Sequence, residues 1–233
     1  MKIAVLISGR GSNMLQLADH ADGGTAGLSD FQIVLVAANT PCEGLDLAAS
    51  RGFDTRLIDR AAHASKQAQE AALGDAIEDS GADMICLAGY MAILSAEFVE
   101  RFAGRIVNIH PSLLPDLKGL DTHERALAAG MARHGATVHL VTAALDDGPV
   151  LLQAGLDVRQ DEDAVSLASR VLRLEHALYP FVMRSLATGV VSISQDGVTW
   201  HHRAAALANA GASLADRLKG AVIWPNQGAT MPK

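Results

Sequence analysis

Three polar residues in the second half of the sequence have side chains suited to acyl transfer without an enzyme nucleophile. They are Asn108 and His110, in the segment 108–115, and Asp146, in the segment 145–149. An amide can donate to a developing oxyanion, an imidazole can move a proton, and a carboxylate can orient that imidazole and favour its charged form. Because each segment follows an apolar run, we expect all three residues on loops after strands. The alternative is a purely structural role for these residues: a strand-end turn at His110 and a loop without function around Asp146, since residues such as those at 146–149 also favour turns.

The composition is that of an ordinary globular chain. It has 233 residues, 49% hydrophobic and 19% charged, which allows one sizeable core. Nineteen basic against 26 acidic residues give a net charge of −7 without a long basic run, which argues against nucleic acid or an anionic membrane as partner. Two cysteines argue against a disulfide framework or a cysteine zinc site. No signal peptide is evident and no apolar segment approaches the roughly 20 residues that span a bilayer, so we expect a soluble cytoplasmic protein.

The first hundred residues alternate between short apolar runs and longer helical segments, which is typical of βαβ units. Right-handed crossovers between such units predict an α/β fold with an open, doubly wound, mostly parallel Rossmann-like sheet. A C-terminal antiparallel hairpin closes the domain, which we place at 1–200, with a C-terminal extension at 201–233. We expect strands over 3–7, 33–37, 55–58, 84–88, 134–142 and 150–158, and a further strand that begins at 106–107. We expect helices that start at about 13, lie near 45–49, and span 65–80, 97–102, 122–130 and 163–186. The hairpin is expected over 190–193 and 198–200, with its turn at 195–197.

A glycine-rich loop at 8–13 joins the first predicted strand to the first helix. Glycines let the backbone approach a ligand closely, and free N–H groups at a helix N-terminus bind anions. A dinucleotide fingerprint would need a small residue where Met14 stands and an acid where Asn39 stands, so a single phosphate is the better ligand. The alternative is a purely structural turn in which Ser12 and Asn13 serve as helix N-caps.

The loops at 8–13, 88–94 and 108–115 each follow a predicted strand of the parallel sheet. Ligands of such sheets bind beside the carboxyl ends of the strands, where the strand order reverses. We therefore expect these loops to open on the same side of the sheet.

Seven segments taken together resemble the phosphoribosylglycinamide formyltransferase family of purine biosynthesis. They are SGRGSN at 8–13, AGYMAILS at 88–95, NIHPSLLP at 108–115, GLDTHERAL at 119–127, HGATVH at 134–139, LDDGP at 145–149 and EHALYP at 175–180. The resemblance runs from residue 1 to about 200, and the tail after about 203 does not contribute. It implies formyl transfer from 10-formyltetrahydrofolate, as co-substrate, to the glycine amine of 5-phosphoribosylglycinamide, without a metal, and it is compatible with a homodimer.

The resemblance also implies roles for individual residues. Asn108, His110 and Asp146 match the family's catalytic residues. The substrate-binding positions are Gly11, Ser12 and Asn13, which match the phosphate loop, and Glu175, which matches the acid that contacts the ribose. The positions that match the folate site are Lys66, Met91, Ala92, Ile93, Leu94, Asn108, Thr142, Ala143, Ala144, Leu145 and Asp146, of which Lys66 aligns only loosely.

Three positions depart from the family's pattern. Asp121 stands where many members have histidine, and Lys118 replaces a common proline. Ala92 replaces a frequent basic residue, which would weaken contacts with the glutamate tail of the folate.

Other functions on the same scaffold remain as alternatives. A 10-formyltetrahydrofolate hydrolase would carry an N-terminal regulatory domain, whereas the first strand here is expected at residue 3. A methionyl-tRNA formyltransferase would need a further RNA-binding domain and a basic surface. A non-catalytic binder of folate or phosphate ligands could keep the loops but would not need Asn108, His110 and Asp146 together. The histidines at 123, 134, 139 and 176 lack the short paired spacing of a zinc motif, so we expect no metal site.

Overall fold

The computed structural model describes residues 1–21, 30–194, 197–201, 203–208 and 212–225 of the chain, which divides into two compact units. Unit 1 is Met1–Asn108 and unit 2 is Ile109–Lys233. Strand β5, Ile106–His110, contributes residues to both. The predicted division into a domain at 1–200 and an extension stays a prediction.

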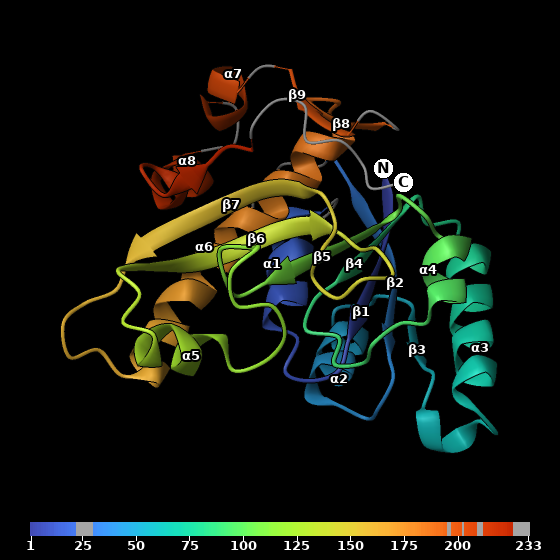
Figure 1. Cartoon of the computed structure of the whole chain (residues 1–233). Coiled ribbons are helices and arrows are strands. Elements are labelled where there is room, and N and C mark those ends of the chain that lie inside the picture. The colour runs from blue at the N-terminus through green and yellow to red at the C-terminus, as the bar shows by residue number, and fades with distance from the viewer. Residues whose placement is uncertain (22–29, 195–196, 202, 209–211, 226–233) are drawn as a thin grey trace. The chain divides into compact units, whose positions relative to one another are not determined.

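Unit 1 is built from βαβ units around a parallel sheet (Figure 1). Within it the strand order is β5-β4-β1-β2-β3, and every neighbouring pair is parallel. Its elements are β1 Lys2–Ile7, α1 Ser12–His20, β2 Gln32–Ala38, α2 Glu43–Ser50, β3 Thr55–Leu57, a 3₁₀ turn at Arg60–Ala62, α3 Lys66–Asp79, β4 Met84–Leu87 and α4 Ala96–Arg101.

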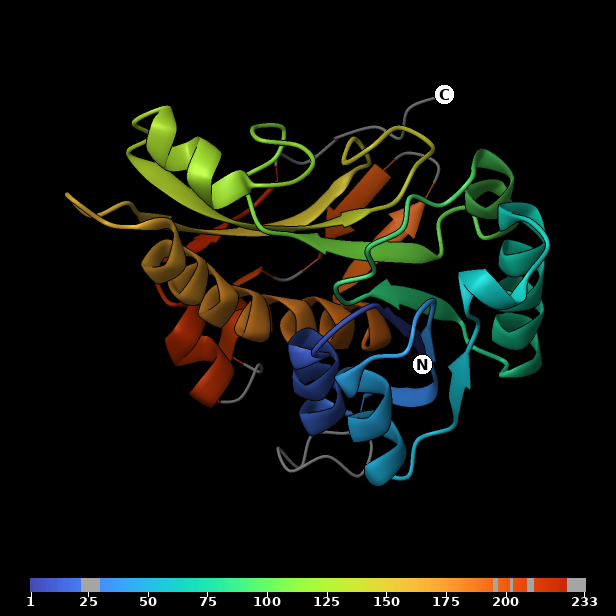
Figure 2. The same ribbon diagram turned by 90° about the horizontal axis from the view of Figure 1, so that it is seen from below.

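The strand order of unit 1 reverses between β1 and β4. The chain runs outward from β1 through β2 to β3 and then crosses back to β4 and β5. Because parallel crossovers are right-handed, α1 and α2 cover one face of the sheet while α3 and α4 cover the other (Figure 2). The central strand is therefore buried on both sides, and Ile3 through Ile7 are all 0% exposed. This reversal is the position at which open α/β sheets bind ligands.

Unit 2 combines an antiparallel sheet with a long helix (Figure 1). Strands β6 and β7 pair antiparallel, the two-residue β10 pairs antiparallel with the other edge of β7, and α6 packs on β6 and β7. The Asp163 side chain caps α6 by accepting from the Ser166 N–H at 2.7 Å. The elements are α5 Thr122–Ala128, β6 Arg133–Leu140, β7 Val150–Asp157, α6 Ala164–Ala187, β8 Val191–Ser194, β9 Gly197–Trp200, α7 Arg203–Ala208, α8 Ala212–Leu218 and β10 Val222–Ile223.

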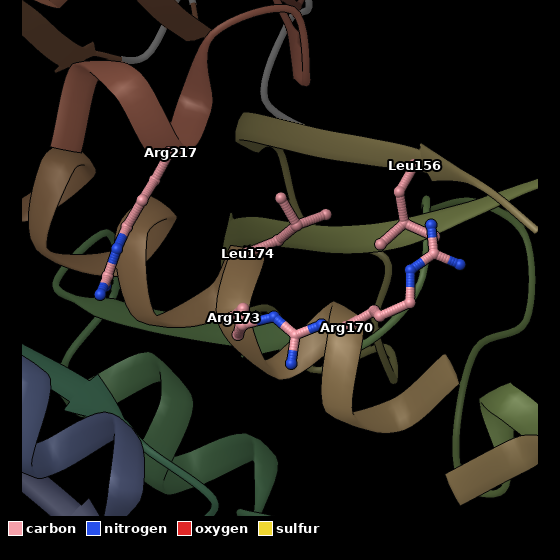
Figure 3. A pocket seen from close by; sticks show the side chains of 5 residues that line it. All are labelled: Leu156, Arg170, Arg173, Leu174 and Arg217. Atoms are coloured by element: carbon pink, nitrogen blue, oxygen red, sulfur yellow. The ribbon is translucent and has the colours of Figure 1, made fainter. Parts of the chain in front are cut away.

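The described part of the C-terminal extension belongs to unit 2 and packs onto its sheet and its long helix. Helix α8 lies against α6 (Figure 3), and β10 adds to the edge of β7. The Trp224 ring meets the Trp200 ring edge-on at 4.8 Å between centroids, and Trp200 stacks on Phe181 at 5.8 Å. The Trp200 indole N–H also donates to the Leu151 carbonyl at 2.8 Å. Aromatic burial of this kind joins the tail to the core of unit 2.

The predicted α/β class, with a mostly parallel sheet and a closing antiparallel hairpin, is confirmed. One strand was predicted too short: β5 continues through Asn108 to His110, so these two residues lie on the strand and not on the loop after it. The predicted hairpin turn includes 195 and 196, which lie outside the described residues. Among the residues that the structure describes, no helix is long and apolar enough to cross a membrane.

Candidate active site

The glycine-rich loop of unit 1 ends in a left-handed residue at the start of α1. Gly11 has φ 74° and is the N-cap of the helix, without a side-chain capping bond. The predicted alternative, in which Ser12 or Asn13 caps the helix, is therefore wrong. The first N–H groups of α1 follow directly after a glycine backbone, as anion sites at helix N-termini require.

This loop has a backbone support that sequence reasoning missed. A Cβ atom on Gly11 would lie 2.9 Å from the Cα of Gly44, and a Cβ on Gly44 would lie 2.6 Å from the Gly9 carbonyl oxygen. The Gly44 N–H also donates to that carbonyl at 3.0 Å. The N-terminal ends of α1 and α2 thus meet backbone to backbone, which only glycine permits at both positions.

Ser8 ties the end of β1 to the loop after β4. Its N–H donates to the Gly89 carbonyl at 3.1 Å, and its hydroxyl donates to the Asn39 side-chain oxygen at 2.6 Å while accepting from the Met91 N–H at 2.8 Å. Between this anchor and the next one, Met91 is 73% and Ile93 71% exposed. The segment 89–95 is therefore a loop whose backbone is anchored and whose apolar side chains are exposed.

The far end of that loop is held by α3. The Glu70 carboxylate accepts from the Ser95 N–H at 2.9 Å and lies 3.6 Å from the Lys66 ammonium. Burial, and then the charge of Glu70, raises the pKa of Tyr90 to about 12, so its phenol stays protonated. Lys66, which we predicted near the ligands, thus pairs with the carboxylate that anchors the end of the 89–95 loop.

Asn108 lies at the same edge of the unit 1 sheet as these loops. It pairs with Leu87 of β4, directly before the loop that begins at Ala88. The predicted common edge is therefore observed in unit 1 for the loops after β1 and β4, with Asn108 beside them, whereas the rest of the predicted 108–115 loop belongs to unit 2. This pairing with β4 also explains why β5 continues past Ile106 and Val107 to include the polar Asn108.

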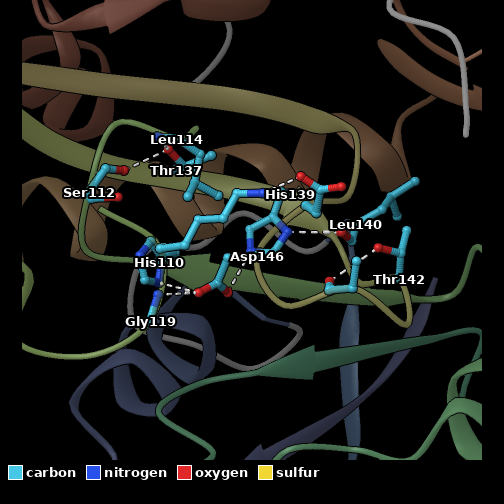
Figure 4. Close-up of polar contacts among 12 residues, drawn as sticks. His110, Ser112, Leu114, Gly119, Thr137, His139, Leu140, Thr142 and Asp146 are labelled. Atoms are coloured by element: carbon cyan, nitrogen blue, oxygen red, sulfur yellow. Dashed lines mark hydrogen bonds and ion pairs between the residues drawn. The ribbon is translucent and has the colours of Figure 1, made fainter. Parts of the chain in front are cut away.

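His110 is buried in unit 2 with an acceptor beside each ring nitrogen. It is 5% exposed, its Nε2 lies 3.0 Å from the Leu117 carbonyl oxygen, and its Nδ1 lies 3.5 Å from Asp146 Oδ2 (Figure 4). A neutral imidazole can donate to only one of these acceptors, whereas the imidazolium can donate to both. Both ring nitrogens of His110 therefore face an oxygen acceptor.

The Asp146 carboxylate lies between two histidines. Besides His110, it faces His139, whose Nε2 is 3.8 Å from Oδ1, and it accepts from the Gly119 N–H at 2.9 Å (Figure 4). Burial lowers the pKa of His139, although its bond to the Leu140 carbonyl and the charge of Asp146 act in the opposite direction. The lowered pKa of His139 favours its neutral ring beside the Asp146 carboxylate.

The loop that carries Asp146 is closed at its base. The Leu140 N–H donates to the Pro149 carbonyl at 2.9 Å, and a Cβ on Gly148 would lie 1.8 Å from the Leu140 carbonyl oxygen. Asp146 itself has φ 48°, a left-handed conformation that aspartate tolerates better than most residues. Within this excursion, the side chains of Ala143, Ala144 and Leu145 are exposed.

The segment after His110 is fixed to the sheet of unit 2 by Thr137 and Gln153, to which the sequence analysis gave no individual role. The Thr137 hydroxyl donates to the Ser112 carbonyl at 2.6 Å and accepts from the Leu114 N–H at 3.0 Å. The Gln153 amide donates to the Leu114 carbonyl at 2.8 Å. Thr137 lies in the segment 134–139 of the family resemblance, but its contacts and those of Gln153 could not be predicted, because their partners are distant in sequence.

The departures from the family's pattern take up positions on this segment. Lys118 forms an ion pair with Asp147, which joins the 117–121 segment to the Asp146 loop. Asp121 is the N-cap of α5 with φ 56°, and its side chain makes no capping bond. Lys118 therefore has a structural role in this ion pair, whereas the Asp121 side chain does not cap the helix that its backbone begins.

A histidine pair lies beneath α5. His123 Nδ1 and His134 Nε2 are 3.1 Å apart, and His134 is 1% exposed. Burial, followed by the charges of His123 and His110, lowers the pKa of His134 to about 4. Burial also lowers the pKa of His123. Near neutral pH the pair shares one hydrogen bond between two uncharged rings.

The remaining predicted residue, Glu175, is buried on α6 at 8% exposure. Within the described ranges there is no group of three or more histidine, cysteine, aspartate or glutamate side chains placed to hold a metal ion. The individual roles of the candidate residues stay predictions.

Comparisons with known proteins place this arrangement in context. Residues 1–183 match the formyl transferase family. Phosphoribosylglycinamide formyltransferase of Escherichia coli (strain K12) is 38% identical over 196 residues, which are 84% of this chain and 92% of the relative. Trifunctional purine biosynthetic protein adenosine-3 of Bos taurus is 37% identical over 201 residues, 85% of this chain but 20% of that protein. The chain thus spans about a fifth of the length of this trifunctional relative.

Solved structures show the same fold. Glycinamide ribonucleotide transformylase 1 from Symbiobacterium toebii superposes with a TM-score of 0.80 at 37% identity, covering 86% of this chain and 93% of that one. Phosphoribosylglycinamide formyltransferase from Brucella melitensis gives a TM-score of 0.74 at 44% identity, covering 82% and 97%.

Proposed function

The chain belongs to the formyl transferase family, and we propose that it transfers a formyl group from 10-formyltetrahydrofolate to the glycine amine of 5-phosphoribosylglycinamide in purine biosynthesis. The observation that carries this proposal is the contact between His110 and Asp146, with Asn108 two residues earlier on β5. Side chains two apart on a strand point to the same face, so Asn108 and His110 can act on one reacting group.

We assign substrate binding in unit 1 to the glycine loop. Gly11, Ser12 and Asn13 offer helix N-terminal N–H groups to the phosphate of the ribonucleotide. In unit 2, Glu175 is assigned to the ribose hydroxyls, for which a carboxylate is a suitable acceptor.

The folate is assigned to two segments. In unit 1, the exposed apolar side chains of Met91 and Ile93 and the backbone of Ala92 and Leu94 suit a flat heterocycle with polar edges. In unit 2, residues 142–146 are the second segment. When bound, the folate supplies the formyl group. Ala92 has no positive charge with which to contact the glutamate tail of the folate. Among the residues assigned to this co-substrate, Lys66 is the basic one.

The chemistry requires no enzyme nucleophile, because the amine of the ribonucleotide attacks the formyl carbon directly. Asn108 donates from its amide to the formyl oxygen while negative charge develops there. Cationic His110 stabilises the same charge and passes a proton from the attacking amine towards the leaving nitrogen, directly or through water. Because Nδ1 faces Asp146, the donating atom is Nε2, and substrate must replace the Leu117 carbonyl as its partner.

The reaction is tested by following tetrahydrofolate release from 10-formyltetrahydrofolate with and without 5-phosphoribosylglycinamide. Release that depends on the ribonucleotide supports the proposal. Release at the same rate without it identifies a hydrolase. No release, with both compounds still binding, identifies a non-catalytic binding protein. A homodimer, the absence of nucleic-acid and membrane partners, and a cytoplasmic location stay predictions from the sequence.

A further inference from the structure

A pocket of about 280 Å³ in unit 2 is lined by three arginines and two leucines, which we call the arginine pocket. Its lining residues are Leu156 of β7, Arg170, Arg173 and Leu174 of α6, and Arg217 of α8 (Figure 3). None of them belongs to the residues proposed for formyl transfer. Arg217 also lies beyond residues 1–183, which match the formyl transferase family.

One of the three arginines is already neutralised and held in place. Arg170 Nη1 donates to both carboxylate oxygens of Glu162 at 2.9 and 2.7 Å, and its Nη2 donates to the Asp157 carbonyl at 3.0 Å. The Arg170 side chain is 16% exposed and that of Glu162 is 3% exposed. This guanidinium therefore forms a fixed wall of the pocket, and it is not a free charge.

The other two arginines bring positive charge without compensation. Across the described residues, neither Arg173 nor Arg217 has a carboxylate within 4.0 Å. Both line the pocket: in Figure 3 the Arg217 side chain comes from α8 to the left of Leu174, and the Arg173 side chain comes from α6 below Leu174 and extends towards Arg170. In a chain with a net charge of −7, two unpaired guanidiniums at one pocket make a local site for an anion.

The geometry favours phosphate over carboxylate. A guanidinium fork matches either group, but a planar carboxylate is filled by one fork. A phosphate has three terminal oxygens, so it can accept from forks on two different helices. The volume suits a compact anion, and the leucines offer an apolar wall for its non-phosphate part.

We propose that the arginine pocket binds a compact phosphorylated anion, such as a diphosphate or a sugar phosphate. The ligand is held by Arg173 from α6 and Arg217 from the C-terminal extension, with Arg170 as a fixed third side. The extension thereby builds a binding site that the residues matched by the family lack. This proposal does not depend on the formyl transfer reaction.

Calorimetric titration of the full chain tests the proposal with three probes: inorganic pyrophosphate, ribose 5-phosphate and, as the carboxylate comparison, citrate. The variants are Arg173→Gln and Arg217→Gln, and the control is Lys219→Gln, which removes an exposed positive charge just after α8 that does not line the pocket. We expect pyrophosphate or ribose 5-phosphate to bind at least about tenfold more weakly in each arginine variant and equally in the control. Circular dichroism verifies that each variant is folded.

Three results would overturn the proposal. Neither phosphorylated probe binds, or binding is the same in all variants, or citrate binds as tightly as the phosphorylated probes with the same dependence on the arginines. Phosphate binding at the glycine loop would persist in the arginine variants, so the two sites are distinguished.

His176 provides a second, spectroscopic readout. Burial, and then the charge of Arg217, lowers the pKa of His176. An anion bound at Arg217 offsets that charge, so saturating pyrophosphate should raise the pKa of the His176 ring in an NMR titration. The same titration curve with and without pyrophosphate would contradict the proposal. His176→Gln assigns the resonance.

Discussion

In unit 1 the candidate phosphate site is made of backbone, whereas in unit 2 the candidate catalytic residues His110 and Asp146 are held by side-chain contacts and burial. Gly11 and Gly44 pack within a distance that no side chain allows. His110 and Asp146 instead depend on charge, with Gly119, Leu117 and His139 around them. The two regions should therefore fail differently, the first in substrate binding and stability and the second in the chemical step.

Among the variants that compare the two regions, the largest effect is expected for Asp146→Asn. Asparagine tolerates the left-handed backbone at φ 48° and can still accept from the Gly119 N–H, so the loop should be retained. The charge beside His110 is lost, and we expect kcat to fall about 10²-fold or more while both KM values change little. Steady-state kinetics measures this. Asp147→Asn, which breaks only the ion pair with Lys118, is the control and should stay within a few-fold. Equal loss in both variants would contradict a charge effect at His110.

Gly11→Ala tests the backbone-built region. The new Cβ would meet the Gly44 Cα at 2.9 Å on a residue with φ 74°. We expect a loss of about 1–3 kcal/mol in the free energy of unfolding and a rise of about tenfold in the KM for the ribonucleotide, with a smaller change in kcat. Gly9→Ala is the matched control, because no atom lies within 4 Å of its Cβ position. If the KM for the ribonucleotide is unchanged in Gly11→Ala, the loop does not bind the phosphate.

The histidine pair predicts the pH dependence of stability in unit 2. The pKa of His134 is about 4 in the folded protein against an ordinary value near 6.5, so the unfolded chain binds more protons between these values. Stability is therefore complete above about pH 6.5 and decreases as the pH falls towards 4, by roughly 2–3 kcal/mol from this residue. Urea unfolding at pH 4.5 and 7.5 measures the loss. His134→Gln should lose less stability between the two pH values than the parent, and an equal loss would disprove the assignment.

Ile93→Ser should have the smallest effect. Ile93 is 71% exposed, so its replacement should leave the stability of unit 1 nearly unchanged while raising the KM for the folate several-fold through lost apolar contact. Val165→Ser removes a similarly exposed side chain, at 76%, from a position assigned to no ligand. If both variants shift the folate KM equally, the 89–95 loop has no specific role in folate binding.

The elements of unit 1 could be predicted well because each is encoded locally. The uninterrupted apolar run of β1 indicates a strand covered on both faces, and the glycines after it indicate a ligand loop. The supports of the site could not be predicted, since Gly44 and Ser8 act through partners distant in sequence. Strand β5 was predicted too short because Asn108 is not a typical strand residue. Its pairing with Leu87 overrides that preference.

Unit 2 was harder to predict for the same physical reason. His139 was predicted not to bind a metal because it lacks the spacing of a zinc motif, and its place beside Asp146 was not predicted, because no spacing rule relates the two residues. Strand β10 has two residues and depends on β7 for its hydrogen bonds, so the alanine-rich tail contained no strand pattern. Arg217 acquires its place in the arginine pocket only through the packing of α8 on α6.

The most direct test of the central claim is single-turnover formyl transfer by His110→Ala protein saturated with both substrates. We predict that both substrates still bind within a few-fold of the parent, because the glycine loop and the 89–95 loop do not involve His110. The chemical step should be slower by about 10²–10⁴-fold. A folded His110→Ala protein whose single-turnover rate is within threefold of the parent rate would contradict the account.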